Sequence, residues 1–94
     1  MKVYTVTRIY NDLGNIEARH VDNTVTIDKK EASNIFGTLH KEDMLYKNMP
    51  DFIEGHAIRY FKEKIAPDSI YQIEFNNIHG QRIQIIATFC ENDI

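Results

Sequence analysis

Alternation of apolar and polar side chains in the last quarter of the chain is the feature that most constrains the fold. Residues 70–75 and 81–90 alternate in this way, and the turn-forming stretch 76–80 (NNIHG) separates them. Because every second side chain of a strand points to the same face, each segment gathers its apolar residues on one face. These residues are Tyr71, Ile73 and Phe75, then Ile83, Ile85, Ala87 and Phe89. The pattern predicts a β-hairpin with one buried face, and Ile86 interrupts its polar face.

The N-terminal quarter carries a second set of strand signals. Residues 3–10 are rich in β-branched and aromatic side chains, a composition typical of strands. Residues 11–15 form a turn around Gly14, and residues 16–20 return as a second strand. Residues 24–27 (TVTI) repeat the β-branched pattern. They are either a third short strand or the far end of the second.

A helix is predicted to begin at Asp28. The Asp28 side chain can accept a hydrogen bond from a first-turn amide, while Glu31 reaches back to the amide of Asp28. The residues behind this cap form one apolar stripe at helical spacing, although Gly37 lies within it. The stripe consists of Ala32, Ile35, Phe36 and Leu39.

A second helix is predicted from Pro50, a favoured first-turn residue, to the stop signal Ala66-Pro67. The element order is then β-β-(β)-α-α-β-β within one small domain spanning residues 1–94. We therefore expect an α+β fold, with a mostly antiparallel sheet and both helices packed on one face.

Charge and composition argue against a nucleic-acid-binding, membrane or secreted protein. The formal net charge is only −3, and acids and bases balance along the first two thirds of the chain. The basic stripe that nucleic-acid binding requires is missing, so we expect no specific nucleic-acid partner. No apolar run approaches the length of a signal peptide core or a membrane span, so no membrane association is expected. A single cysteine, Cys90, favours a cytoplasmic location.

Candidate catalytic and metal-binding residues are sparse. The four histidines, His20, His40, His56 and His79, show no metal-ligand spacing. We therefore expect no metal, no cofactor and no enzymatic activity. If the chain were an enzyme, His56 and Cys90 would be the residues to test.

Residues 44–49 (MLYKNM) are unusually apolar for a connection between two helices. They are interpreted either as buried, in a lid or an extension of the first helix, or as an exposed contact patch. In the second interpretation Met44, Leu45, Tyr46 and Met49 form an apolar protein-contact anchor. The acidic residues Glu74, Glu91 and Asp93, in the part of the chain that carries the net negative charge, would steer the chain towards a basic surface.

In length and in its abundance of Ile, Asn, Lys, Asp and Glu, the chain resembles short accessory proteins of phages and mobile elements from AT-rich bacteria. Such proteins include anti-CRISPR inhibitors of host defence. The resemblance implies a non-enzymatic protein-binding module that inhibits a bacterial target by stoichiometric occlusion. The alternative is a cytosolic small-ligand-binding or metabolic accessory domain, acting as a homodimer, with a pocket lined by Tyr60, Phe61 and Tyr71.

Overall fold

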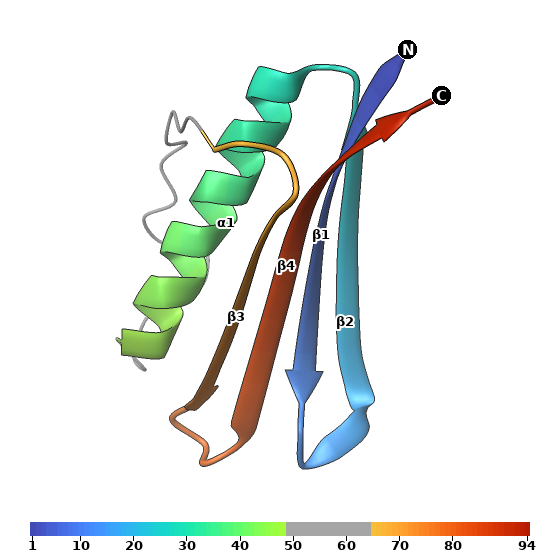
Figure 1. Ribbon diagram of the computed structural model, residues 1–94. Coiled ribbons are helices and arrows are strands. Elements are labelled where there is room, and N and C mark those ends of the chain that lie inside the picture. The colour runs from blue at the N-terminus through green and yellow to red at the C-terminus, as the bar shows by residue number, and fades with distance from the viewer. Residues whose placement is uncertain (49–64) are drawn as a thin grey trace.

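The computed structural model describes residues 1–48 and 65–94. A four-stranded antiparallel sheet has the order β2-β1-β4-β3, and one helix, α1, lies along one of its faces (Figure 1). The elements are β1 (Lys2–Asp12), β2 (Asn15–Thr26), α1 (Lys29–Asn48), β3 (Ser69–Asn76) and β4 (Arg82–Asp93). The first and last strands are therefore neighbours in the centre, and the Ile94 amide donates to the Met1 carbonyl at 2.8 Å.

The α+β class and the C-terminal hairpin are confirmed. β3 and β4 pair from Ser69 opposite Phe89 to Asn76 opposite Arg82. Residues 24–27 are the far end of the second strand and not a separate third strand. β2 runs unbroken to Thr26, which pairs with Tyr4. β2 is an edge strand, so its polar Asp22 and Asn23 remain at the surface and do not interrupt the pairing.

The N-terminal cap of α1 is confirmed, with one correction. The Asp28 carboxylate accepts from the amides of Lys30 at 3.0 Å and Glu31 at 3.3 Å. The Glu31 side chain does not reach the Asp28 amide. It accepts from the Thr26 hydroxyl at 3.0 Å, and the Asp28 amide donates to that same hydroxyl at 3.1 Å. In a capping box the Glu31 carboxylate would accept directly from the Asp28 amide. Here the Thr26 hydroxyl lies between these two groups and is hydrogen-bonded to both.

α1 is longer than the apolar stripe suggested, because it continues through Gly37 to Asn48. Residues 44–48 therefore belong to the helix, in agreement with the helix-extension interpretation. The second predicted helix, from Pro50, falls almost entirely on residues 49–64, which lie outside the described residues. Within the described part of the chain the sheet carries one helix.

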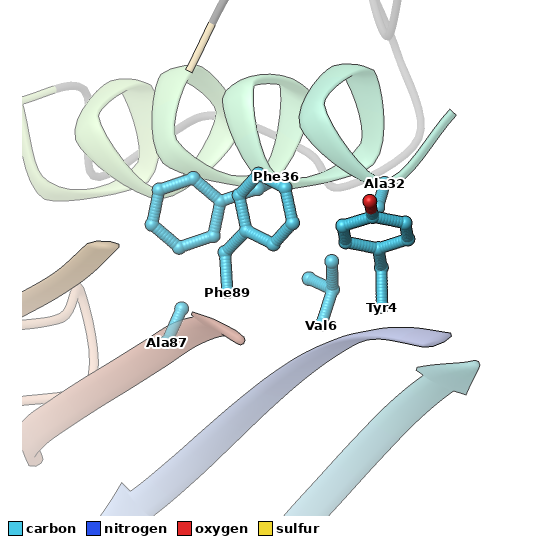
Figure 2. Close-up of a cluster of buried hydrophobic side chains, with 6 residues drawn as sticks. All are labelled: Tyr4, Val6, Ala32, Phe36, Ala87 and Phe89. Atoms are coloured by element: carbon cyan, nitrogen blue, oxygen red, sulfur yellow. The ribbon is translucent and has the colours of Figure 1, made fainter. Parts of the chain in front are cut away.

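The core lies between α1 and the sheet in two clusters. Figure 2 shows the first, in which Ala32 and Phe36 of the helix point at side chains of β1 and β4. Its members are Tyr4, Val6, Ala32, Phe36, Ala87 and Phe89. The second consists of Ile73, Phe75, Ile83 and Ile85, with Met44 and Tyr46 packed against it. The alternation of the hairpin thus buries the face that the sequence predicted.

Candidate functional site

A buried ion pair joins the centre of β1 to the second half of α1. Arg8 Nε donates to both carboxylate oxygens of Asp43 at 3.1 Å, and Arg8 Nη2 donates to Oδ1 at 2.8 Å. The Tyr71 hydroxyl of β3 donates to Oδ2 at 2.5 Å. Only 4% of the Asp43 side chain and 12% of the Arg8 side chain are exposed. One carboxylate therefore ties the helix to both an inner and an outer strand.

The protonation of Tyr71 is fixed by this contact. Burial and the adjacent Asp43 carboxylate raise the pKa of the Tyr71 phenol well above its usual range, so the hydroxyl remains a donor at neutral pH. The Arg8 guanidinium carbon also lies 5.8 Å from the centre of the Tyr10 ring, within cation–π range. Arg8 is thus held by both a carboxylate and an aromatic face.

A hollow of about 310 Å³ opens beside this ion pair. β1 and β2 form one side of it and α1 the other. The lining residues are Arg8 and Tyr10 of β1, His20 and Asp22 of β2, and Glu42, Asp43 and Tyr46 of α1. His20 Nε2 lies 3.1 Å from Asp22 Oδ1 at the exposed rim. This volume is at the small end of the range of small-molecule sites.

One phenol in the hollow, that of Tyr10, is poorly suited to accept a proton. Burial, a hydrogen bond with Tyr46 and the nearby Asp12 raise the pKa of Tyr10 to about 12, so this phenol is a poor base at neutral pH. Arg8 is already paired with Asp43. Among the described residues, no three histidine, cysteine or acidic side chains are grouped as metal ligands.

The Arg8–Asp43 ion pair was not predicted from the sequence, although the positions of both residues in their hydrophobic patterns indicate it. Arg8 occupies the inward phase of β1, between Val6 and Tyr10. Asp43 falls on the apolar stripe of α1, since residues 32, 36, 39, 43 and 46 follow the spacing of one helix face. Two opposite charges, each flanked by apolar residues on its own face, predict a buried partner for one another.

The residues of the proposed apolar anchor do not share one face of α1. Met44 and Tyr46 turn inwards, and the Tyr46 ring packs edge-on against Phe75 at 4.8 Å between centres. Leu45 points outwards and is 38% exposed. Met49 lies outside the described residues. Of the anchor residues in the described part of the chain, Leu45 alone is exposed.

The three acidic contact residues are not brought together. Glu74 lies on the side of the sheet opposite α1 and pairs with Arg82 at 3.3 Å. Glu91 and Asp93 lie at the other end of β4, where Glu91 pairs with Lys2 at 3.7 Å and Asp93 with the N-terminal ammonium at 3.6 Å. Each charge is thus partly compensated within the chain, and the three form no common surface.

The remaining candidates are dispersed. Cys90 is a free, partly exposed thiol on β4. The His40 ring packs against Tyr71 at 4.8 Å, and His79 is exposed in the β3–β4 turn. His56, Tyr60 and Phe61 lie outside the described residues. Tyr71 is not among the residues that line the hollow, and its hydroxyl is bound to Asp43.

The face of the sheet away from α1 carries no other described element (Figure 1). A row here is a set of residues paired side by side across the four strands. We use the term open face for the side chains on this side of the sheet from the row that contains Val3 to the row that contains Ile9. They are Val3, Thr5, Thr7 and Ile9 of β1, Val21, Asn23 and Val25 of β2, Ile70 and Gln72 of β3, and Ile86, Thr88, Cys90 and Asn92 of β4. None of these side chains is charged, and Val21, Val25 and Ile70 are 51%, 59% and 66% exposed.

Comparison with known proteins gives no relative. No protein-family model, no curated protein and no solved structure matches the chain significantly. No helix in the described ranges has the length and apolar character needed to cross a membrane.

Proposed function

We propose that the chain is a non-enzymatic protein-binding module and that the open face is its contact surface. The observation that carries the proposal is the absence of charge on this face, among the described strands, together with its exposed Val and Ile side chains. Uncharged surface with exposed apolar side chains and a charged rim is typical of protein interaction sites. The rim exists here, because Arg19, Glu74 and Arg82 lie in the rows beyond Ile9 on the same side of the sheet.

The dimensions and chemistry of the open face indicate the kind of partner. Four strands about 4.8 Å apart give a width of about 14 Å, and six steps along a strand give a length of about 20 Å. An amphipathic helix about 10 Å in diameter fits within this area. We therefore propose a partner with an apolar, uncharged contact surface. Electrostatic steering by Glu74, Glu91 and Asp93 has less support, since each lies beside a cation of the same chain.

The compositional resemblance to phage accessory proteins adds the biological part of the proposal. The partner would be a bacterial protein, such as a component of a defence system, and binding would inhibit it by occluding its surface at a fixed stoichiometry. Residues 44–46 would contribute through Leu45 at most, because Met44 and Tyr46 are held in the core.

The test compares two double variants in affinity capture from a nuclease-treated bacterial lysate. Val21→Lys/Ile70→Lys places two charges on the open face, at edge-strand side chains that are already exposed. Leu13→Lys/Ile78→Lys adds the same charge at exposed apolar residues in the two hairpin turns. Because all four side chains are 45% exposed or more, both variants should fold.

The proposal predicts that one partner is captured at a fixed ratio by the wild type and by the turn variant, and is lost from the open-face variant. Retention of the same partner by both variants would place the contact elsewhere. Recovery of the chain alone as a dimer, which the open-face variant converts to a monomer, would identify a second copy as the occupant. Light scattering after size exclusion separates these outcomes.

A further inference from the structure

The outer backbone edge of β2 is a candidate contact surface that the proposed function does not involve. β2 stands first in the sheet order, so among the described strands it pairs only with β1 (Figure 1). This pairing is regular from Arg19 to Thr26, and the shift in register lies beyond Arg19, towards the β1–β2 turn. An edge strand directs a row of N–H and C=O groups away from its neighbour, and these groups can pair with another strand.

The sequence of this edge lacks the common protections against strand pairing. Natural edge strands often carry lysine, proline or a bulge that prevents the addition of another strand. Residues 19–26 (RHVDNTVT) contain no lysine, proline or glycine, and apart from His20 only Arg19 and Asp22 can carry a charge. Asp22 Oδ1 already lies 3.1 Å from His20 Nε2 of its own chain. The regular part of β2 therefore favours pairing with a second extended strand.

β2 is complementary to a second copy of itself in one register. In an antiparallel pair related by a two-fold axis, one residue faces its own copy and the residues on either side face each other in reverse order. With Asn23 on the axis, Val21 faces Val25 of the second copy and Asp22 faces Thr24. Both valines are more than half exposed in the single chain. Apolar side chains then face each other, and the carboxylate faces a hydroxyl that can donate to it.

Neighbouring registers lose this match. With Asp22 on the axis, two carboxylates face each other directly, which is destabilising. With Val21 on the axis, Val25 faces Glu17, which lies outside the regular part of the strand. With Thr24 on the axis, Val25 faces an asparagine. Of these registers, the one centred on residue 23 pairs residues 20–26 without either fault.

We propose that two copies of this chain pair through β2 in antiparallel orientation, with Asn23 facing Asn23 of the second copy. Main-chain hydrogen bonds then join the two four-stranded sheets into one. The two-fold axis is perpendicular to the sheet, so both open faces lie on the same side of it. The open-face side chains of β1, β3 and β4 take no part in the pairing, and the proposal does not depend on a protein partner there.

The experiment is disulfide trapping in the full chain, with Cys90→Ser removing the native thiol. Asn23→Cys places two thiols opposite each other, where the Cα atoms of facing residues lie about 4.5–5.5 Å apart, within the range of a disulfide. Val21→Cys and Val25→Cys are the matched controls, because both side chains are exposed and lie on the same side of β2 as Asn23. In the proposed register the two copies of either control residue are four strand steps apart, about 13 Å, so neither control should cross-link alone.

We expect mild oxidation to cross-link the Asn23→Cys chain at least about tenfold faster than either control, because pairing raises the effective concentration of the facing thiols. A mixture of the Val21→Cys and Val25→Cys chains should also cross-link, since these two positions face each other. This mixed pair tests the register without changing Asn23. Light scattering should show the wild type forming a dimer as its concentration rises.

Three results would overturn the proposal. The first is the absence of any cross-link in folded variants, with circular dichroism as the check on folding. The second is cross-linking of Val21→Cys alone, which would centre the pairing on another residue. The third is loss of the Asn23→Cys cross-link on adding Ile70→Lys, which changes the open face on β3 and leaves β2 untouched, because the copies would then meet through their open faces. Capture of a protein partner is measured separately, so either proposal can fail without the other.

Discussion

Replacing Arg8 with Met should destabilise the fold far more than the loss of any surface ion pair. Asp43 is 4% exposed and accepts all of its charged hydrogen bonds from Arg8. Removing one partner of such a pair leaves a buried carboxylate without compensation, which costs about 3–5 kcal/mol. A small domain has a total stability of only about 5–15 kcal/mol, so this is a large fraction of it.

Urea denaturation followed by far-ultraviolet circular dichroism measures the effect. With a slope of about 1–1.5 kcal/mol/M, the midpoint of Arg8→Met should fall by about 2–5 M relative to the wild type. The matched control is Arg82→Met, because the Arg82–Glu74 pair is 49% and 37% exposed. That substitution should cost less than about 1 kcal/mol.

A double variant tests whether the cost comes from an uncompensated charge. Arg8→Met/Asp43→Leu removes both ions and should be more stable than Arg8→Met alone, although the Tyr71 hydroxyl then loses its acceptor. A loss below about 1 kcal/mol for Arg8→Met would refute the reasoning. Strict additivity of the two single substitutions would refute it as well, because the two side chains would then not be coupled.

Three further effects follow from local geometry. Asp28→Ala removes the acceptor of two first-turn amides and should cost about 1 kcal/mol in urea denaturation, and no loss would refute the cap. Gly80 has a φ of 74°, and no atom lies within 4 Å of the place that an alanine methyl would take, so Gly80→Ala should cost about 1–2 kcal/mol through backbone strain alone. Gly14→Ala, whose new carbon would lie 3.5 Å from Asp12 Oδ1, should cost less; equal losses would contradict this. The pKa of Tyr10 is raised to about 12 and that of Tyr71 is also raised, so their contribution to stability should be constant below pH 10 and decrease between pH 10 and 12. Tyr10→Phe should reduce this alkaline decrease in the urea midpoint, and an unchanged decrease would rule Tyr10 out as its source.

The strands and the start of the helix were predictable because their signals are local. Alternation over residues 83–89 fixes which side chains are buried, and the Asp28 cap fixes where α1 begins. The end of α1 was not predictable from the apolar stripe. Gly37 lowers helix propensity, but packing of the helix against the sheet outweighs this cost, as tertiary contacts commonly do.

The candidate sites depend on contacts between distant parts of the chain, so the sequence identified them only in part. Arg8 and Asp43 are 35 positions apart, and their pairing requires α1 to cross the centre of the sheet. The sequence marked Met44 and Tyr46 as candidate contact residues, but helical phase decides that they face the core and that Leu45 does not. Ile86 was visible as an apolar residue on a polar face, and the strand order adds Ile9 and Val21 beside it.

The central claim is that a protein partner covers the open face, and Cys90 tests it most directly. Cys90 is the only cysteine of the chain, its thiol is free and partly exposed, and it lies on the open face opposite Thr5. The rate of thiol modification by N-ethylmaleimide should therefore be compared between the free chain and its captured complex. We predict at least about tenfold slower modification in the complex, because labelling then requires dissociation of the interface. An unchanged rate in a complex of fixed stoichiometry would show that the partner binds elsewhere and would contradict the claim.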